Sequence, residues 1–312
     1  MAALGLVILI LAGDSLVKGA VNLALRLGIP AMIVSLTVVA FGTSAPELLI
    51  SIKAALENVP GIALGNVVGS NTANVLLVLG LPAIIAAMHT AECDTRKSYL
   101  QMLAATVLFI GLAFMGTFTW VSGLILLAGL ALILGSAIRD VLAHKNGAAA
   151  EAEVLEELEG ADDSMPGWRV GVYLVLGLVG LPLGADILVD NAQIIAKDYG
   201  VSDTVIGLTL VAVGTSLPEL ATTFMAALRK QTDVALGNVI GSNFFNLLAI
   251  IGVASLIHPI EVASEFLTFD LWVMLAASLL LVPFVFLKWN ITRLWGFVFS
   301  GLYAAYVVAV II

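Results

Sequence analysis

A stretch of the sequence running from Gly42 to Asn74 recurs from Gly214 to Asn246, always 172 residues later and without a gap. Each copy contains Gly-Thr-Ser-x-Pro-Glu and then Gly-Asn-x-x-Gly-Ser-Asn-x-x-Asn. The same shift also places Asp14 on Asp186. Chance does not hold one register over so long a stretch, so the chain consists of two copies of one structural unit.

The sequence around these copies is too apolar for a soluble protein. Of the 312 residues, 61% are hydrophobic and 11% are charged, whereas soluble domains carry about 25% charged residues. Apolar runs of about 20 residues, long enough to span a bilayer as helices, recur along the whole chain. We therefore predict an all-α, polytopic membrane protein. The ten predicted segments are roughly 3–27, 30–57, 61–88, 98–116, 119–141, 169–198, 201–228, 233–257, 267–288 and 292–311.

Each copy of the repeat contains five of these predicted segments. Because five is odd, the two copies should insert into the membrane in opposite directions. We thus expect a first five-helix repeat over 1–141, an acidic linker over 142–168 and a second five-helix repeat over 169–312. Inverted repeats with interrupted helices at matching positions are typical of secondary transporters, whose sites lie near the midplane.

The charges on the chain predict its orientation. The net charge of −9 comes partly from the acidic linker, and this argues against a nucleic-acid partner, whose binders need basic faces. With the linker in the cytoplasm, ten basic residues lie on or near the cytoplasmic side and only Lys53 and Lys197 lie on the other. The positive-inside rule favours this arrangement. We expect a multi-pass protein of the cell membrane with both termini outside.

Two glutamates, Glu47 and Glu219, lie near the middle of predicted segments. A carboxylate at that depth is costly to bury unless it meets a cation or a polar cavity. We therefore interpret both glutamates as cation ligands rather than as purely structural residues.

A proline precedes each of these glutamates and changes the helix around it. Pro46 and Pro218 lack an N–H and clash with the carbonyl four residues earlier, so both helices should bend. Carbonyls near Thr43 and Thr215 then lose their helical partners, which lipid tolerates only where they line a cavity or bind something. Carboxylate, hydroxyl and carbonyl oxygens together are the ligands of a hard cation, and a motif without thiolate or imidazole disfavours soft metals.

The second half of the motif adds hydroxyls and amides. Ser70 and Asn74 are four residues apart and share a helical face, as do Ser242 and Asn246. We expect these four to contribute to the site. For the other motif asparagines, interhelical hydrogen bonding is an equal alternative to ion binding; these are Asn66, Asn71, Asn238 and Asn243. The motif glycines are small-xxx-small pairs that should permit close helix packing; these are Gly65, Gly69, Gly237 and Gly241.

Three further acids lie well inside predicted segments. Asp14 and Lys18 are four residues apart and could pair on one helical face, whereas Asp190 replaces that lysine beside Asp186 in the second copy. We expect these acids to face a cavity or anchor a helix rather than to coordinate the cation directly. The single cysteine, Cys93, and the three histidines form no spaced ligand set, so we expect no cofactor and no histidine-based metal site.

The paired motifs resemble those of the sodium/calcium exchanger family, within the cation/calcium antiporter superfamily. Segment number and predicted orientation are similar as well, so the resemblance covers essentially the whole membrane domain. The linker is too short for the large regulatory domains of animal relatives, which makes the prokaryotic type the nearer comparison. The resemblance implies a secondary antiporter that exchanges Na⁺ for Ca²⁺ by alternating access, with no obligate protein partner besides the lipid bilayer.

The resemblance also implies roles for motif residues. In the family, the two motif glutamates and the threonine carbonyls bind Ca²⁺, which here means Glu47, Glu219, Thr43 and Thr215. The motif serines form the Na⁺ sites, here Ser44, Ser216, Ser70 and Ser242, with carbonyls that correspond to Ala40 and Ala212. Some relatives, including potassium-dependent ones, carry Asp at the position of Asn246, so Asn here suggests that K⁺ is not co-transported.

Two other functions remain open from the sequence. Buried carboxylates could exchange protons, so a Ca²⁺/H⁺ antiporter is the alternative within the transporter class. A cation channel is the alternative of another class, although broken midplane helices favour a carrier. We expect no enzyme activity, because no nucleophile–base set or histidine accompanies the glutamates.

Overall fold

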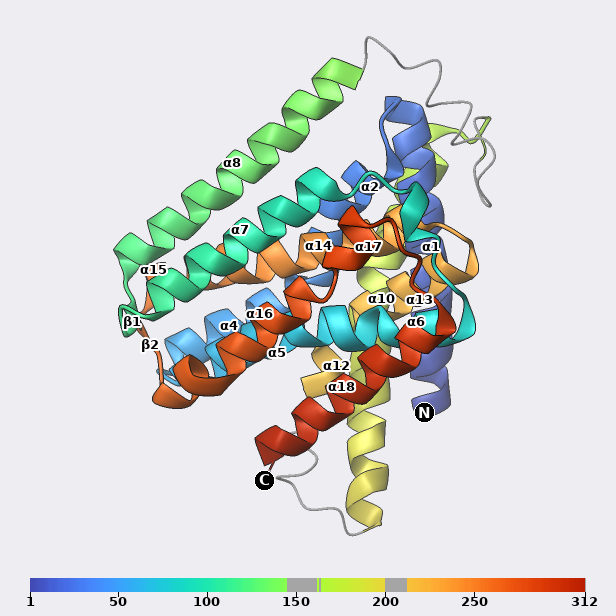
Figure 1. Cartoon of the computed structure of the whole chain (residues 1–312). Coiled ribbons are helices and arrows are strands. Elements are labelled where there is room, and N and C mark those ends of the chain that lie inside the picture. The colour runs from blue at the N-terminus through green and yellow to red at the C-terminus, as the bar shows by residue number, and fades with distance from the viewer. Residues whose placement is uncertain (145–161, 163, 200–211, 312) are drawn as a thin grey trace.

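The computed structural model describes residues 1–144, 162, 164–199 and 212–311 (Figure 1). The first copy of the repeat consists of α1 (Ala2–Leu27), α2 (Ala31–Val34), η1 (Ser35–Val39), α3 (Ala40–Thr43), α4 (Ala45–Leu56), α5 (Pro60–Ala73), η2 (Asn74–Val78), α6 (Gly80–Ile85), η3 (Thr90–Glu92), α7 (Arg96–Ala113), β1 (Thr117–Phe118) and α8 (Trp120–His144). The second copy consists of α10 (Gly167–Asp198), α12 (Ala212–Thr215), α13 (Leu217–Leu228), α14 (Thr232–Phe244), η5 (Phe245–Ile250), α15 (Ile251–Ile257), β2 (Ile260–Glu261), η6 (Phe266–Asp270), α16 (Leu271–Leu279), α17 (Val282–Phe286) and α18 (Arg293–Ile311).

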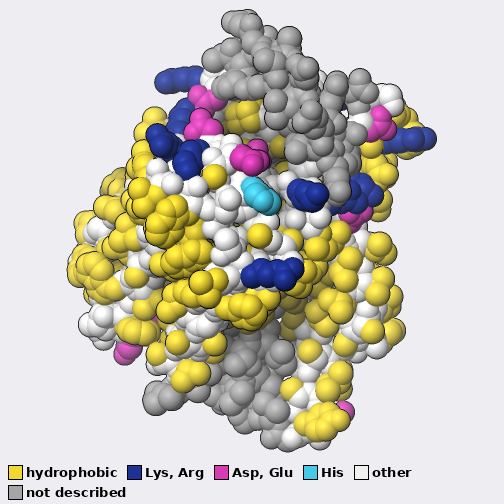
Figure 2. Space-filling view, turned by 45° about the vertical axis from the view of Figure 1, so that its right-hand side comes forward, with side chains coloured by type: hydrophobic (Ala, Val, Ile, Leu, Met, Phe, Trp, Pro, Cys, Tyr) yellow, Lys and Arg dark blue, Asp and Glu magenta, His cyan; other side chains and the backbone are white. Residues whose placement is uncertain are grey.

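Seven helices or joined helices in the described part of the chain are long and apolar enough to cross a membrane. The bent pair Ala31–Thr43 and Ala45–Leu56 adds an eighth span if it is counted as one. Two predicted segments are not among these eight: α7 begins with Arg96 and Lys97, and residues 200–211 of the segment 201–228 lie outside the described residues. Figure 2 shows a broad apolar surface with charged side chains gathered mainly at its upper end, as expected for a membrane protein.

The two longest helices, α1 and α10, lie side by side (Figure 1). Their backbones approach closely because glycines alternate along the contact: a Cβ added at Gly177 would lie 2.5 Å from Cβ of Leu16, and one at Gly5 would lie 2.6 Å from the nitrogen of Leu188. The start of α1 and the end of α18 lie at the lower end of the molecule in Figure 1, while α8 ends and α10 begins at the upper end.

The two copies share the same breaks. The backbone leaves the helix at Ser44 (φ −84°, ψ 4°) and at Ser216 (φ −89°, ψ 6°), one residue before α4 and α13. The first break bends the chain by 44°, which confirms the bend predicted from Pro46. Asn58 and Lys230, also 172 residues apart, both take the left-handed φ of 56° between the next two helices.

Contacts between the copies occur in reciprocal pairs. Thr117 pairs with Glu261 in the short sheet formed by β1 and β2, and an equivalent bridge joins Met88 to Ile291. In the same way α8 packs against α15 while α18 packs against α6. When the two elements of one contact are exchanged for their equivalents in the other copy, another contact results, which is the pattern of two units packed around a two-fold axis.

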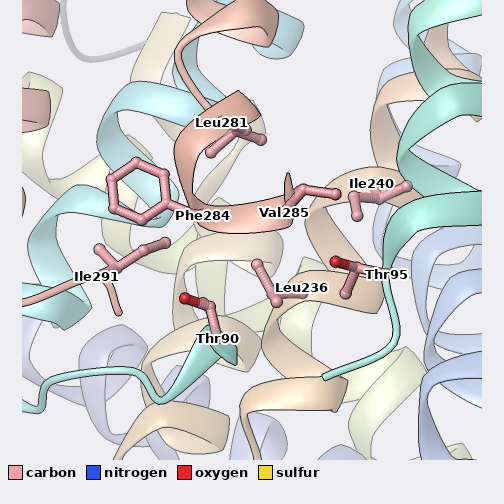
Figure 3. A pocket seen from close by; sticks show the side chains of 8 residues that line it. All are labelled: Thr90, Thr95, Leu236, Ile240, Leu281, Phe284, Val285 and Ile291. Carbon is pink, nitrogen blue, oxygen red and sulfur yellow. The ribbon is translucent and has the colours of Figure 1, made fainter. Parts of the chain in front are cut away.

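A small cavity lies between α14, α17 and the loop around η3 (Figure 3). Its volume is about 10 Å³, and no charged side chain is among those lining it, which are Thr90, Thr95, Leu236, Ile240, Leu281, Phe284, Val285 and Ile291. A space of this size holds one water molecule at most, so it is a packing defect rather than a substrate site.

Candidate cation site

Glu47 and Glu219 occupy equivalent places at the start of two helices. Each lies in the first turn, of α4 or α13, just after the break at Ser44 or Ser216. Both side chains are fully buried, with 0% of their surface exposed. The positive end of a helix dipole favours a carboxylate at this position, so the break that the motif proline enforces also creates a place for the charge.

The neighbouring helices α5 and α14 fix the backbone of each glutamate through an asparagine. Asn66 donates from Nδ2 to the carbonyl of Glu47 at 3.1 Å and to the hydroxyl of Ser51 at 3.0 Å. In the second copy, Asn238 donates to the carbonyl of Glu219 at 3.2 Å and to the hydroxyl of Thr223 at 3.1 Å. Their amide nitrogens therefore make the interhelical hydrogen bonds that the sequence left as one alternative to ion binding.

Residues from both copies meet around Glu219. The hydroxyl of Ser44 donates to Oε1 of Glu219 at 3.2 Å. The hydroxyl of Thr43 donates to Oδ1 of Asn238 at 3.2 Å and lies 3.4 Å from the hydroxyl of Ser242. Glu47 is close enough to Glu219 for the two carboxylates to interact electrostatically. The site is thus shared by the two repeats.

Several buried oxygens of the two motifs have no hydrogen-bond partner in the described part of the chain. They are both carboxylate oxygens of Glu47, Oε2 of Glu219, the hydroxyl of Ser216, Oδ1 of Asn74 and Oδ1 of Asn246. Buried carboxylate oxygens without partners are costly unless a proton or a cation meets them. All of these atoms are hard oxygen ligands, which suits a cation such as Ca²⁺ or Na⁺.

The remaining predicted ligands differ in their burial and in their hydrogen bonds. Ser70 is buried on α5, and Thr215 ends α12 and is partly exposed. The carbonyl of Ala40 accepts the N–H of Ser44 at 3.0 Å and lies 3.3 Å from the hydroxyl of Thr43, whose single hydrogen it shares with Oδ1 of Asn238. Ala212 is the first described residue after the gap at 200–211.

A cavity of about 220 Å³ lies beside the motif prolines, between α4, α10 and α12. Asp186 and Asp190 of α10 line it together with Thr215 of α12. These two aspartates therefore face a cavity, one of the two roles predicted for them. The other lining residues are Pro46, Ile50, Pro182, Ala185, Val189, Gln193, Gly214 and Pro218.

Asp14 has a different environment from its counterpart Asp186. It pairs with Lys18 at 2.9 Å, as the four-residue spacing predicted, and it also forms an ion pair with Arg229 at the end of α13. The second contact anchors α1 to α13. No sequence signal indicated it, because Glu57 stands at the position equivalent to Arg229 in the first copy.

Comparison with known proteins identifies the family of this chain. A family model described as "Sodium/calcium exchanger protein" matches residues 1–139 and 170–312. The chain is 38% identical to the "Putative antiporter CaxA" of Alkalimonas amylolytica, over 89% of this chain and 86% of that protein. It is 35% identical to the "Sodium/calcium exchanger MaX1" of Methanosarcina acetivorans, over 98% and 96% of the two chains.

A solved structure extends the likeness to three dimensions. The sodium-calcium exchanger NCX_Mj, soaked with 2.5 mM Na⁺ and 0.1 mM Ca²⁺, superposes with a TM-score of 0.81 at 33% sequence identity. The superposition covers 97% of this chain and 95% of that one. The family match covers nearly the whole chain, and the fold and the paired motifs agree with it. The protein is a polytopic membrane protein that belongs to the sodium/calcium exchanger family.

Proposed function

We propose that this protein exchanges Na⁺ for Ca²⁺ across the cell membrane by alternating access. The observation that carries the proposal is the pair Glu47 and Glu219, fully buried where two broken helices begin, with three of their four carboxylate oxygens lacking partners in the described residues. Two buried carboxylates suit one divalent cation. The similarity to MaX1 and NCX_Mj, both named as sodium/calcium exchangers, supports the same pair of ions.

The ligands are assigned to the two ions as follows. Ca²⁺ binds Glu47 and Glu219 together with the carbonyls of Thr43 and Thr215. Na⁺ binds the serine hydroxyls together with the carbonyls of Ala40 and Ala212, and the amide oxygens of Asn74 and Asn246 are available to either ion. The serines are Ser44, Ser70, Ser216 and Ser242. Since the two ions draw on neighbouring oxygens of one site and cannot occupy it together, they compete, and this competition couples their movements.

The exchange is electrogenic under this proposal. The two carboxylates give the empty site a charge near −2, which one Ca²⁺ neutralises and which three Na⁺, the stoichiometry implied by the family, overcompensate. Each cycle then moves one net charge, worth about 2.3 kcal/mol per 100 mV. An inside-negative potential drives Na⁺ inward and Ca²⁺ outward, so the physiological direction is Ca²⁺ export.

Ten spans in two inverted five-helix repeats accommodate this cycle, with the linker in the cytoplasm and both termini outside. The cavity beside the C-terminal half of α10 then opens on the outer side, while the ion pair between Asp14 and Arg229 holds α1 against α13 on the inner side. We therefore assign this structure to an outward-facing state. Movement of α1 and α10, which pack together through their glycines, switches access.

A Ca²⁺/H⁺ antiporter is the second candidate, because carboxylate oxygens without partners also accept protons. Proteoliposomes loaded with Ca²⁺ and given separate Na⁺, K⁺ and pH gradients distinguish the two functions. We expect flux only with the Na⁺ gradient, and a faster flux when a K⁺/valinomycin potential favours Na⁺ movement. Flux that follows the pH gradient without Na⁺ supports the proton antiporter, and conductance without any counter-ion supports a channel.

A further inference from the structure

Two buried methionines stand 172 residues apart and make the same contact with the opposite copy of the repeat. Asn243 on α14 donates from Nδ2 to the sulfur of Met102 on α7 at 3.6 Å. Asn71 on α5 donates to the sulfur of Met274 on α16 at 3.7 Å. A thioether accepts hydrogen bonds and never donates them. Each methionine therefore draws the NH₂ end of its asparagine and turns the amide oxygen the other way.

In one of these two places, the orientation of the asparagine amide also determines the orientation of a third residue. The outward oxygen of Asn243 accepts a hydrogen bond from Nδ2 of Asn74 at 3.0 Å. Asn74 is buried, and its Oδ1 has no partner in the described part of the chain. Through the contacts Met102–Asn243–Asn74, the NH₂ group of Asn74 is held toward Asn243 and its oxygen is left available.

The equivalent place in the other copy has the same residues but lacks the last bond. Asn71 faces Met274, yet its Oδ1 has no partner, and neither does Nδ2 or Oδ1 of the buried Asn246. All three atoms are among the described residues. The missing bond would join Nδ2 of Asn246 to Oδ1 of Asn71, and both atoms are without a partner in the described residues. The arrangement around Asn246 therefore repeats the one around Asn74, except that this hydrogen bond is not formed.

We propose that Met102 with Asn243, and Met274 with Asn71, are positioning residues that present the amide oxygens of Asn74 and Asn246 to the transported cation. An amide can offer either an oxygen or an NH₂ group, and only the oxygen attracts a cation. The methionine sulfur, which only accepts hydrogen bonds, fixes the orientation of the first asparagine. That asparagine then determines which end of Asn74 or Asn246 faces the ion. At Asn246 the contact to Asn71 closes when a cation holds Oδ1, since the NH₂ group is then the end left to donate.

The inference rests on the proposed function, because it takes Asn74 and Asn246 as ligands of the transported ions. It adds that four residues outside the predicted ligand set control the site. It also gives the two methionines a role that leucine could not fill, because leucine has a similar volume but no sulfur to accept a hydrogen bond.

Met102→Leu tests the inference because it nearly conserves volume while removing the acceptor. Without the sulfur, Asn243 no longer has a preferred orientation, and Asn74 presents its oxygen only part of the time. We expect the apparent KM for Ca²⁺ to rise about fivefold, the equivalent of about 1 kcal/mol for one hydrogen bond, while the maximal rate stays within a factor of two. Met274→Leu acts in the same direction through Asn246.

A double-mutant cycle separates this role from general packing. In an Asn74→Ala background, Met102→Leu should have no further effect on Ca²⁺ affinity, because the residue through which it acts is gone. Met115→Leu, at a position with 72% of its surface exposed, serves as the control and should match the wild type. Thermal unfolding of each variant verifies that the fold is intact.

Ca²⁺ affinity measured by calorimetry on the detergent-solubilised protein keeps this test independent of the coupling ion. An unchanged affinity in Met102→Leu overturns the inference, and so does an equal loss with and without Asn74. If the wild type binds Ca²⁺ but shows no Na⁺-driven flux, the proposed function fails while the positioning roles are still read from binding. If exchange proceeds and the methionine variants match the wild type, the positioning roles alone fail.

Discussion

The hydroxyl of Ser44 donates a hydrogen bond of 3.2 Å to Oε1 of Glu219, so a serine of the first motif stabilises the carboxylate of the second. The reciprocal contact is not made: the hydroxyl of Ser216 and both carboxylate oxygens of Glu47 have no partner in the part of the chain that the structure describes. Two sequence-equivalent carboxylates therefore have different surroundings in this state, and substitutions of the two motif serines should have different effects.

Glu47→Gln and Glu219→Gln should each abolish measurable Ca²⁺ binding. Each change removes one of the two negative charges that balance a divalent ion. The two motifs contain no other carboxylate that could replace it. Calorimetric titration of the solubilised protein with Ca²⁺ measures the effect. Glu57→Gln is the control, because that exposed carboxylate faces Lys53 at 3.9 Å outside the site. Near-normal Ca²⁺ affinity in both motif variants contradicts the site assignment.

Ser44→Ala and Ser216→Ala should differ in their effect on Ca²⁺. Both remove a hydroxyl proposed for Na⁺, so both should raise the Na⁺ concentration for half-maximal exchange. Only Ser44→Ala also removes a hydrogen bond to Glu219, a bond to a charged group worth about 2 kcal/mol, and only it should change Ca²⁺ affinity markedly. Ser264→Ala, at an exposed helical position just before η6, is the control. Equal Ca²⁺ affinities in the two variants argue against the observed asymmetry.

Arg229→Gln should shift the protein away from the state described here. The arginine joins α1 to α13 through Asp14, and both side chains keep about a fifth of their surface exposed, so the contact is worth about 1 kcal/mol at most. The shift is measured by maleimide labelling of Gln193→Cys, in the cavity, with Cys93→Ala as background. We expect labelling from outside to slow by up to about fivefold.

The neighbouring Lys230→Gln is the matched control for this experiment, because it removes the same charge from an exposed position. Slowed labelling in both variants indicates a general charge effect. Unchanged labelling in Arg229→Gln means that the ion pair does not hold α1 in place.

Gly241→Ala should destabilise the protein or prevent it from folding. A Cβ at this position would lie 2.5 Å from the carbonyl oxygen of Leu36 and 2.5 Å from Cβ of Ala40, and the backbone oxygen has no flexible side chain to move away. Overpacking of this kind costs about 1–3 kcal/mol. Thermal unfolding in detergent measures the effect. Gly111→Ala, on an exposed face of α7, is the control, and equal melting temperatures contradict the expectation.

Cys93 should react slowly with maleimide in the native protein. Burial raises the pKa of its thiol, the neighbouring Asp233 carboxylate adds to the rise, and only 5% of the residue is exposed. Because the thiolate is the reactive form, its fraction is small near pH 8 and the labelling rate should still increase above pH 9. Labelling followed by mass spectrometry, native against denatured, measures this. A native rate equal to the denatured rate contradicts it.

The sequence repeat predicted most of the features that the two copies share in this structure. The matching breaks at Ser44 and Ser216 follow from the prolines, because the chemistry of proline acts locally wherever the fold places it. The close packing expected from small-xxx-small pairs is confirmed for Gly237, which meets α2 and η1, and for Gly241, which meets η1 and α3. For Gly65 the nearest described atom is 3.9 Å away, in Phe266, and the residues equivalent to η1 fall in the gap at 200–211.

Contacts that join the two copies could not be predicted. The ion pair between Asp14 and Arg229 has no counterpart in the other repeat, and the bond between Asn74 and Asn243 depends on how α5 and α14 cross. The ligand assignments, the ten-span count and the membrane orientation remain predictions, since they depend on bound ions and on the bilayer. Residues 145–161, which include most of the acidic linker, lie outside the described part of the chain.

Ca²⁺ uptake into proteoliposomes driven by an outward Na⁺ gradient, at equal pH on both sides, tests the account most directly. Wild-type protein should accumulate Ca²⁺ against its gradient when Na⁺ is inside and should not when K⁺ replaces it, and Glu47→Gln should be inactive in both cases. Equal Ca²⁺ uptake with Na⁺ or K⁺ inside, or full uptake by Glu47→Gln, contradicts sodium/calcium exchange at the paired glutamates.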